Sequence, residues 1–194
     1  LDEPNGDRSC VPTYLLCKYA SSKVKVALGG DGGDELFSGY SRYPGLNRQI
    51  GGGKFCNAKE TLKAYFSFGL PVFGFGVGRL FDRDYSDEFL SSLATNVYSP
   101  TDIEQAIRFV DFKSYLPGAV LAKVDRMSMQ TSLEVRTPFF NPELVDLCSR
   151  LPHQFLYRGS EMKPILRDIC RHLGLEHVAN LPKKGFGMPG EFLN

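Results

Sequence analysis

The pattern of apolar and polar residues predicts a helix followed by a strand near the start of the chain. Ser9 is a good N-cap residue, and Pro12 falls in the first turn of a helix that should end near Ser21. The side chains expected on its buried side are Val11, Tyr14, Leu15, Cys17 and Tyr19. Residues 24–28 are mostly apolar and β-branched, which is typical of a buried strand. Helix followed by strand suggests an α/β unit.

A loop of glycines and carboxylates follows this strand directly. Residues 29–35 read Gly-Gly-Asp-Gly-Gly-Asp-Glu. Glycine permits positive φ angles and lets a bulky ligand approach the backbone closely. Asp31, Asp34 and Glu35 are hard oxygen donors, suited to Mg²⁺ that is shared with phosphates. A helix is then expected to begin at Leu36. Because the loop follows the carboxyl end of a strand, it lies where open α/β sheets bind ligands, although a plain acidic turn is the alternative.

Beyond the triple glycine at residues 51–53 the pattern predicts helices and no further strand. The expected helices cover 58–68, 86–94, 101–116, 118–132, 141–150 and 160–173. Asn141 is a good N-cap with Pro142 at the first helical position, and Gly174 is a natural C-terminal stop. The predicted fold class is therefore α/β, mostly helical after one clear strand.

The amino-acid composition argues against nucleic acid and membranes as general partners. The 194 residues are 42% hydrophobic and 23% charged, enough for one ordinary domain, or one and a part, with a real core. Basic and acidic residues nearly cancel, 23 against 22, so the composition carries no general attraction to nucleic acid or membrane. No apolar run approaches the roughly 20 residues of a membrane span. An anion must therefore be bound locally.

The cysteines and histidines do not form a metal or nucleophile motif. The five cysteines include no C-x-x-C pair and no zinc spacing, and the three histidines lie in the last quarter. A reduced cytoplasmic protein is the simplest interpretation. The chain begins with Leu1 and has no charged-then-apolar leader, so a fragment of a longer protein is expected.

Several blocks together resemble a known family. They are Val26 to Tyr40 (Val-Ala-Leu-Gly-Gly-Asp-Gly-Gly-Asp-Glu-Leu-Phe-Ser-Gly-Tyr), Lys123 to Met129 (Lys-Val-Asp-Arg-Met-Ser-Met), Ser132 to Phe139 (Ser-Leu-Glu-Val-Arg-Thr-Pro-Phe) and Pro182 to Pro189 (Pro-Lys-Lys-Gly-Phe-Gly-Met-Pro). In this order, spread over the chain, they resemble the glutamine-hydrolysing asparagine synthetase family.

The resemblance implies a truncated pyrophosphatase-type adenine-nucleotide-binding fold. Residues 1–194 would be the carboxyl-terminal part of an asparagine synthetase domain. The family's Ser-Gly-Gly-x-Asp-Ser loop, the first nucleotide-binding strand and the amino-terminal glutaminase domain would lie upstream of Leu1. The fragment alone is therefore expected to be inactive.

The resemblance also implies a reaction. The family converts aspartate to asparagine with ATP and Mg²⁺ through an acyl-adenylate, and it releases AMP and pyrophosphate. Ammonia comes from glutamine through the glutaminase domain. The expected partners are these small molecules, with no nucleic acid and no membrane, and a homodimer is consistent with the resemblance.

Site residues follow by similarity. Gly29 and Gly30 would contact the nucleotide through their backbone, and Asp34 would help to hold Mg²⁺. Asp31, where the family often carries Glu, would orient or deprotonate ammonia. Lys183 would neutralise charge on the phosphates; its alternative is a surface basic pair with the next lysine.

Two further residues are expected to bind substrate. Lys123 would face an anionic substrate or AMP, and Arg8 would grip a substrate carboxylate, because guanidinium binds carboxylates bidentately. Glu134 and Arg136 are expected to form a buried network that holds the next turn, with a catalytic role as the alternative.

The chain also departs from the family pattern. Gly29 replaces the usual Ser, and Asp31 is shorter than Glu. Two alternatives therefore stay open: a family member that acts on another carboxylate, as in β-lactam or peptide cyclisation, or a non-catalytic interaction domain that keeps the fold.

Overall fold

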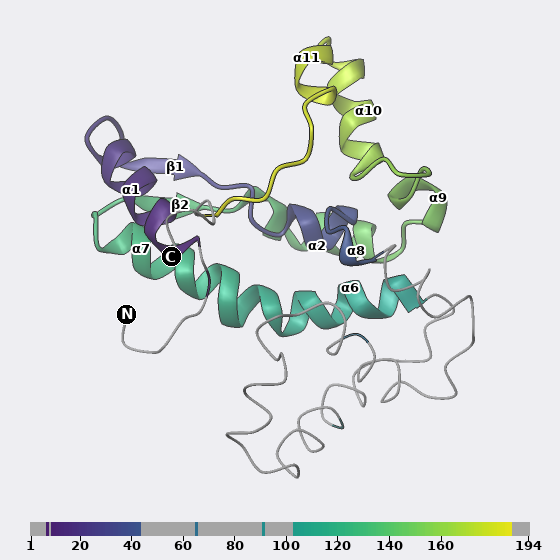
Figure 1. Cartoon of the computed structure of the whole chain (residues 1–194), viewed down its shortest axis with the longest axis horizontal. Coiled ribbons are helices and arrows are strands. Elements are labelled where there is room, and N and C mark those ends of the chain that lie inside the picture. The colour runs from purple at the N-terminus through teal and green to yellow at the C-terminus, as the bar shows by residue number, and fades with distance from the viewer. Residues whose placement is uncertain (1–6, 8, 44–64, 66–90, 92–102, 188–194) are drawn as a thin grey trace, which may run out of the picture. The chain divides into compact units, whose positions relative to one another are not determined.

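The computed structural model describes residues 7, 9–43, 65, 91 and 103–187 (Figure 1). The chain divides into two compact units. The first comprises residues 1–39 together with 114–194, and the second comprises residues 40–113.

The first unit carries most of the described elements. In chain order they are α1 (Cys10–Ser21), β1 (Val26–Leu28), α2 (Gly33–Phe37), the π-helix η2 (Leu116–Leu121), α7 (Ala122–Met129), β2 (Glu134–Arg136), the 3₁₀ helix η3 (Pro138–Phe140), α8 (Pro142–Ser149), α9 (His153–Leu156), α10 (Pro164–His172) and α11 (Glu176–Ala179). This arrangement is mostly helical with a small sheet, which confirms the α/β class.

The described sheet has two parallel strands, which lie side by side in Figure 1. Val26 is in register with Glu134, and Leu28 with Arg136. The pairing continues past β1, because the Gly29 amide donates to the Arg136 carbonyl at 2.8 Å. The glycine loop after β1 and the segment after β2 therefore leave the sheet at the same edge.

The prediction of no second strand was wrong. β2 reads Glu-Val-Arg, polar on both sides of one apolar residue, so no apolar run marked it. Glu134 and Arg136 are also not a buried network. Both side chains are more than half exposed, and they pair with each other, with Arg136 Nε 2.7 Å from Glu134 Oε1.

The strand before the loop is shorter and more open than predicted. β1 contains three residues, and Leu28 is 75% exposed, so within the described residues this strand is not buried. The buried side of α1 was also predicted incorrectly. Val11, Leu15 and Tyr19 are at least half exposed, whereas Cys17 is buried as expected.

The reason lies in how α1 packs. It contacts α7, and its buried residues are Thr13 and Cys17. Ser9 precedes α1 but its side chain does not cap the helix; its hydroxyl donates instead to Asp7 Oδ1 at 2.6 Å. The distribution of apolar residues along α1 therefore predicted the wrong side of the helix as buried.

Later helices follow the predictions with local changes. The predicted helix 118–132 is split into η2 and α7, and α2 begins at Gly33 instead of Leu36. The Asn141 cap of α8 is confirmed, since Asn141 Oδ1 accepts the amides of Glu143 and Leu144. The predicted helices 58–68 and 86–94 lie outside the described residues, apart from residues 65 and 91.

Helix α10 begins at Pro164, four residues later than predicted, because the preceding Lys163 has a left-handed backbone with φ 54°. It ends close to Gly174, where φ is +72°, as the glycine stop predicted. This late start puts the Lys163 side chain at a turn.

The second unit is described mainly through α6 (Ile103–Lys113), which confirms the predicted helix 101–116. Asp111 on α6 is fully buried. Its carboxylate accepts hydrogen bonds from Arg42 at 2.6 Å, Tyr43 at 2.8 Å and Tyr65 at 2.7 Å. The core of this unit therefore contains a satisfied polar cluster.

No helix in the described part of the chain combines the length and apolar character needed to cross a membrane.

Candidate functional site

The glycine loop lies against side chains that follow β2. A Cβ on Gly29 would lie 2.9 Å from Asp31 Oδ2 and 3.1 Å from Val135 Cγ1. Gly32 has φ +86°, which favours glycine, and a Cβ there would lie 3.1 Å from the Phe140 ring. At Gly29 and Gly32 the backbone therefore passes too close to Asp31, to β2 and to the segment after it to leave room for a side chain.

Two lysines converge on Asp34, at the start of α2. Lys183 Nζ lies 2.8 Å from Asp34 Oδ1 and 3.0 Å from Oδ2. Lys163 Nζ lies 2.9 Å from the same Oδ1. The three side chains retain between a fifth and a third of their exposed area. The glycine loop therefore carries two cations on one carboxylate, still open to water.

Gly39 makes room for this cluster. A Cβ at this position would lie 1.8 Å from Asp34 Oδ1 and 2.2 Å from Lys163 Cε. Neither distance is compatible with the pairing as it stands. The glycine that follows α2 by two residues is therefore part of the geometry that brings Asp34 and Lys163 together.

The environment shifts the pKa values of the two loop carboxylates, Asp31 and Asp34, in opposite directions. Burial alone would raise the pKa of Asp34, but Lys163 and Lys183 outweigh it and hold the pKa below its usual 3.8. Burial raises the pKa of Asp31 above 3.8; the charge of Lys123 opposes this shift and the charge of Asp34 adds to it. Asp31 is therefore the carboxyl of this pair that takes up a proton first.

Lys123 does not join the two lysines on Asp34. Its Nζ donates to Asp7 Oδ2 at 2.8 Å and to Ser9 Oγ at 2.6 Å, and the residue is buried. Burial tends to raise the pKa of Asp7, but the bonds from Lys123 and Ser9 hold it below its usual value. Lys123 still acts on the loop through space, since its charge lowers the pKa of Asp31.

The structure thus brings together part of the predicted site. Asp34 and Lys183, 149 residues apart, are in direct contact, and Gly29, Gly30 and Asp31 lie on the same loop. Lys183 thus contacts a loop carboxylate, and its role toward the phosphates stays a prediction. Arg8 lies outside the described residues.

Sequence reasoning missed Lys163. It stands before a proline at the start of an amphipathic helix, and no local pattern separates it from the other lysines of the chain. The signal is the Lys-Pro pair, since a proline at the first helical position fixes where the helix begins. The Lys-Pro pair does not predict that the Lys163 amine contacts Asp34.

A self-contained metal centre is not found in the part of the chain that the structure describes. No group of three or more His, Cys, Asp or Glu side chains there is arranged to hold a metal ion. Cys10, Cys17, Cys148 and Cys170 are free thiols.

Comparison with known proteins places these features in context. The chain is 28% identical over 218 residues to asparagine synthetase (glutamine-hydrolyzing) 1 of Bacillus subtilis, covering 97% of this chain and 34% of that protein. It is 31% identical over 220 residues to a Mycobacterium bovis protein named "Putative asparagine synthetase (glutamine-hydrolyzing)", covering 97% and 33%. The chain thus spans about a third of the length of these curated relatives.

A shorter stretch is more similar still. Over 39 residues, 20% of this chain and 8% of the relative, the chain is 56% identical to a Methanocaldococcus jannaschii protein named "Putative asparagine synthetase (glutamine-hydrolyzing) 2". No solved structure matches the chain significantly. The family model described as asparagine synthase matches residues 1–191, nearly the whole sequence, and the chain therefore belongs to the asparagine synthase family.

Proposed function

We propose that this chain is the part of an ATP-dependent amide-forming synthetase that handles the nucleotide phosphates. Its substrate would be aspartate, converted to asparagine, as the names of its relatives suggest. The observation that carries the proposal is the convergence of Lys163 and Lys183 on Asp34 at the end of a glycine loop. We further propose that the nucleotide-binding fold is of the pyrophosphatase type.

The proposed reaction has two steps. A carboxylate oxygen of aspartate attacks the α-phosphorus of ATP, and the bond to the bridging oxygen of the β-phosphate breaks, so pyrophosphate leaves. Ammonia then attacks the acyl carbon, the bond to AMP breaks, and the nitrogen loses a proton. Negative charge develops on the leaving pyrophosphate in the first step, and a base is needed in the second.

The two lysines suit the first step. Asp34 and the two amines are partly exposed to water, so an amine can turn from the carboxylate to a phosphate oxygen without first leaving a buried environment. Lysine amines are compact charges on flexible stems, which supports such an exchange. Lys163 and Lys183 would neutralise the charge of the departing pyrophosphate, and Asp34 would keep both amines in place beforehand.

Asp31 suits the second step. It lies on the same loop, three residues before Asp34, and its pKa is raised by burial. A carboxylate with a raised pKa is a better proton acceptor than an ordinary one. Asp31 would therefore orient the ammonia and receive its proton, while Lys123 limits how far the pKa rises.

The loop is chemically suited to a nucleotide and to Mg²⁺. A Cβ on Gly30 would meet nothing within 4 Å, so the backbone there is open to a ligand. Asp31 and Asp34 offer the carboxylate oxygens that Mg²⁺ prefers, and one or two protein carboxylates suffice when substrate phosphates and water supply the rest. When bound, the ion would neutralise phosphate charge. Asp34 is the residue that would hold it, in place of the two amines once they have turned to the phosphates.

The remaining partners are proposed from the family. Ammonia would come from a glutaminase domain elsewhere in the full-length protein, and Arg8 and Lys123 would help to bind substrate. Residues 1–194 would then be a carboxyl-terminal part of the synthetase domain, inactive alone, and the protein would be cytoplasmic, with a homodimer as a further possibility.

The test is ATP–pyrophosphate exchange, measured with the full-length protein. Lys183→Ala should slow exchange by about 10²–10³-fold, the effect of removing one preorganised charge donor. Lys184→Ala, at the neighbouring position, is the matched control and should exchange at the wild-type rate. Asp34→Asn should weaken the dependence of exchange on Mg²⁺. Equal rates for Lys183→Ala and Lys184→Ala would remove Lys183 from the reaction.

The choice of carboxylate is tested in the same assay. Aspartate should stimulate exchange more than other amino-acid carboxylates, whereas stimulation by a different carboxylate alone would move the protein to a cyclising or other synthetase. If the wild-type protein neither binds Mg-ATP nor exchanges pyrophosphate, the non-catalytic interaction domain is the correct function.

A further inference from the structure

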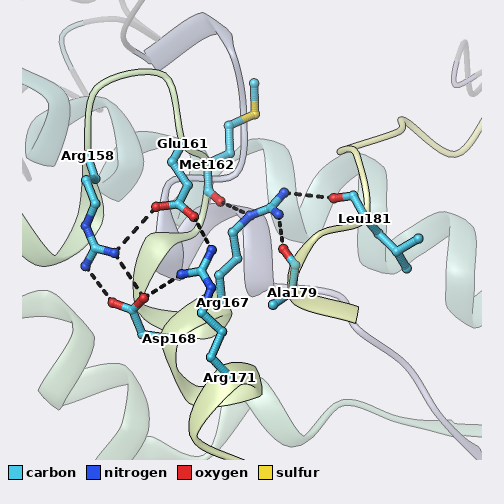
Figure 2. Close-up of polar contacts among 8 residues, drawn as sticks. All are labelled: Arg158, Glu161, Met162, Arg167, Asp168, Arg171, Ala179 and Leu181. Carbon is cyan, nitrogen blue, oxygen red and sulfur yellow. Dashed lines mark hydrogen bonds and ion pairs between the residues drawn. The ribbon is translucent and has the colours of Figure 1, made fainter. Parts of the chain in front are cut away.

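Arg167, on α10, binds three main-chain carbonyls at once (Figure 2). Its Nε donates to the Met162 carbonyl at 3.0 Å, and its two terminal nitrogens donate to the carbonyls of Ala179 and Leu181, the latter at 3.0 Å. Two of these carbonyls belong to segments outside any helix or strand. Arg167 therefore joins α10 to the turn before it and to the chain after α11.

Both of those segments carry a lysine of the candidate site. Met162 immediately precedes Lys163, and Leu181 stands two residues before Lys183. The two lysines are 20 residues apart in the sequence, yet both amines reach Asp34. A single side chain thus ties the backbone of both lysine-bearing segments to one helix.

The segment of Lys183 is held through its backbone as well as through the Lys183 amine. Residues 180–187 form no helix or strand, and the Leu181 side chain is 59% exposed. The Leu181 amide donates to the Val178 carbonyl at 3.2 Å, and Arg167 donates to the Leu181 carbonyl. Hydrogen bonds to the backbone therefore help to set the position of the Lys183 side chain. An arginine fork can supply them to several carbonyls in fixed directions, which a lysine ammonium cannot do.

A second group of ion pairs holds the turn on its other side, also drawn in Figure 2. Asp168 accepts from Arg158 at 3.0 and 2.5 Å and from Arg171 at 2.7 Å, and Arg171 also donates to Glu161 at 2.9 Å. These side chains are more exposed than Asp34 and contact no carbonyl of the lysine segments. Arg171, one turn after Arg167, is therefore a natural control.

We propose that Arg167 is a positioning residue that places both Lys163 and Lys183 on Asp34. The geometric part of this inference stands on the contacts above. Its consequence for catalysis rests on the proposed function. Arg167 acts through the two lysines and touches neither Asp34 nor the loop in the interactions described.

The first experiment measures geometry without catalysis. Lysine amines in the substrate-free full-length protein are labelled with an acylating reagent, and each site is quantified by mass spectrometry. Lys183 should be protected by Asp34 relative to its neighbour Lys184. In Arg167→Met, labelling of Lys183 should rise several-fold toward the rate of Lys184, whereas Arg171→Met should leave it unchanged.

The second experiment measures the consequence. In ATP–pyrophosphate exchange, Arg167→Met should lower the rate by on the order of 10–10²-fold, the scale expected when a group is misplaced by about 1 Å. In a Lys183→Ala background the same substitution should have a clearly smaller effect, because Arg167 acts partly through the missing amine. Arg167→Lys keeps the charge and the stem, and replaces Arg167→Met if that variant does not fold.

The outcomes separate the two proposals. Unchanged Lys183 labelling in a folded Arg167 variant overturns the positioning role, whatever the activity. Fully additive losses in the double variant also contradict it. If the wild-type protein shows no exchange while labelling of Lys183 still depends on Arg167, the positioning role stands and the proposed function fails.

Discussion

The two units each place an aspartate among cations or hydrogen-bond donors, but they do so in opposite ways. Asp111 in the second unit is fully buried and accepts from one arginine and two tyrosines. Asp34 in the first unit is partly exposed and meets two lysine amines. The first arrangement is closed, and the second keeps contact with water.

The donors explain what each arrangement does. Arginine and tyrosine present donors in fixed directions, so they satisfy Asp111 in one geometry and specify a unique core. Lysine amines rotate on flexible stems and can change partners. A buried carboxylate with donors in fixed directions serves the fold, whereas a partly exposed carboxylate with lysine donors is suited to exchange with a ligand.

The largest expected effect is on stability and tests this contrast directly. Asp111→Ala removes the carboxylate that pairs with Arg42, and breaking a buried ion pair this way costs about 3–5 kcal/mol of the free energy of unfolding. Asp34→Ala should cost much less, because Lys163 and Lys183 can turn to water. Urea unfolding of both variants measures the difference, and similar losses would show that the two clusters play the same role.

The next largest effect is on activity, and it tests whether the cluster of Asp34, Lys163 and Lys183 tolerates a side chain at position 39. Gly39→Ala places a methyl group where Asp34 and Lys163 now lie, so exchange activity should fall by on the order of 10²-fold. Gly118→Ala is the control, since a Cβ there meets nothing within 4 Å. Equal activity of the two variants would show that the Asp34 cluster tolerates displacement.

The smallest effect is the pH dependence of the two loop carboxylates. Asp34 has a pKa below 3.8 in the folded protein, so its contribution to stability is complete above that pH and is lost as pH falls through the lower value. Asp31 has a raised pKa, so its ionisation opposes folding above that pKa, and this opposition fades as pH falls toward 3.8.

Carbon-13 NMR of the aspartate carboxyls would measure both titrations. Asp31 should take up its proton at a higher pH than Asp34, and Lys183→Ala should move the Asp34 titration upward. The reverse order of titration would contradict the described electrostatics of the loop.

The sequence predicted those features that one local stretch encodes. The glycine loop, the strand before it and the Asn141 cap each depend on residues within a few positions of one another. The contact between Asp34 and Lys183 was suggested only by the family resemblance, because no local pattern relates positions 149 residues apart.

The missed features depend on tertiary packing. β2 is recognisable as a strand only once Val26–Leu28 pairs with it, since Glu134–Arg136 has no apolar run. The exposed side of α1 was misjudged because packing on α7 selects Thr13 and Cys17 in place of the larger apolar residues. The Asp111 cluster joins residues from three separated stretches, so no spacing rule predicts it.

At Lys163, whose backbone is left-handed, a substitution that favours stability would remove the amine that contacts Asp34. This conformation costs a non-glycine residue roughly 1–2 kcal/mol, more than the roughly 0.5–1 kcal/mol of chain entropy that glycine would add. A library sorted only for heat resistance or expression would therefore be drawn toward glycine at this position and would discard the amine. The amine at position 163 is thus held on Asp34 at a conformational cost that glycine would not carry.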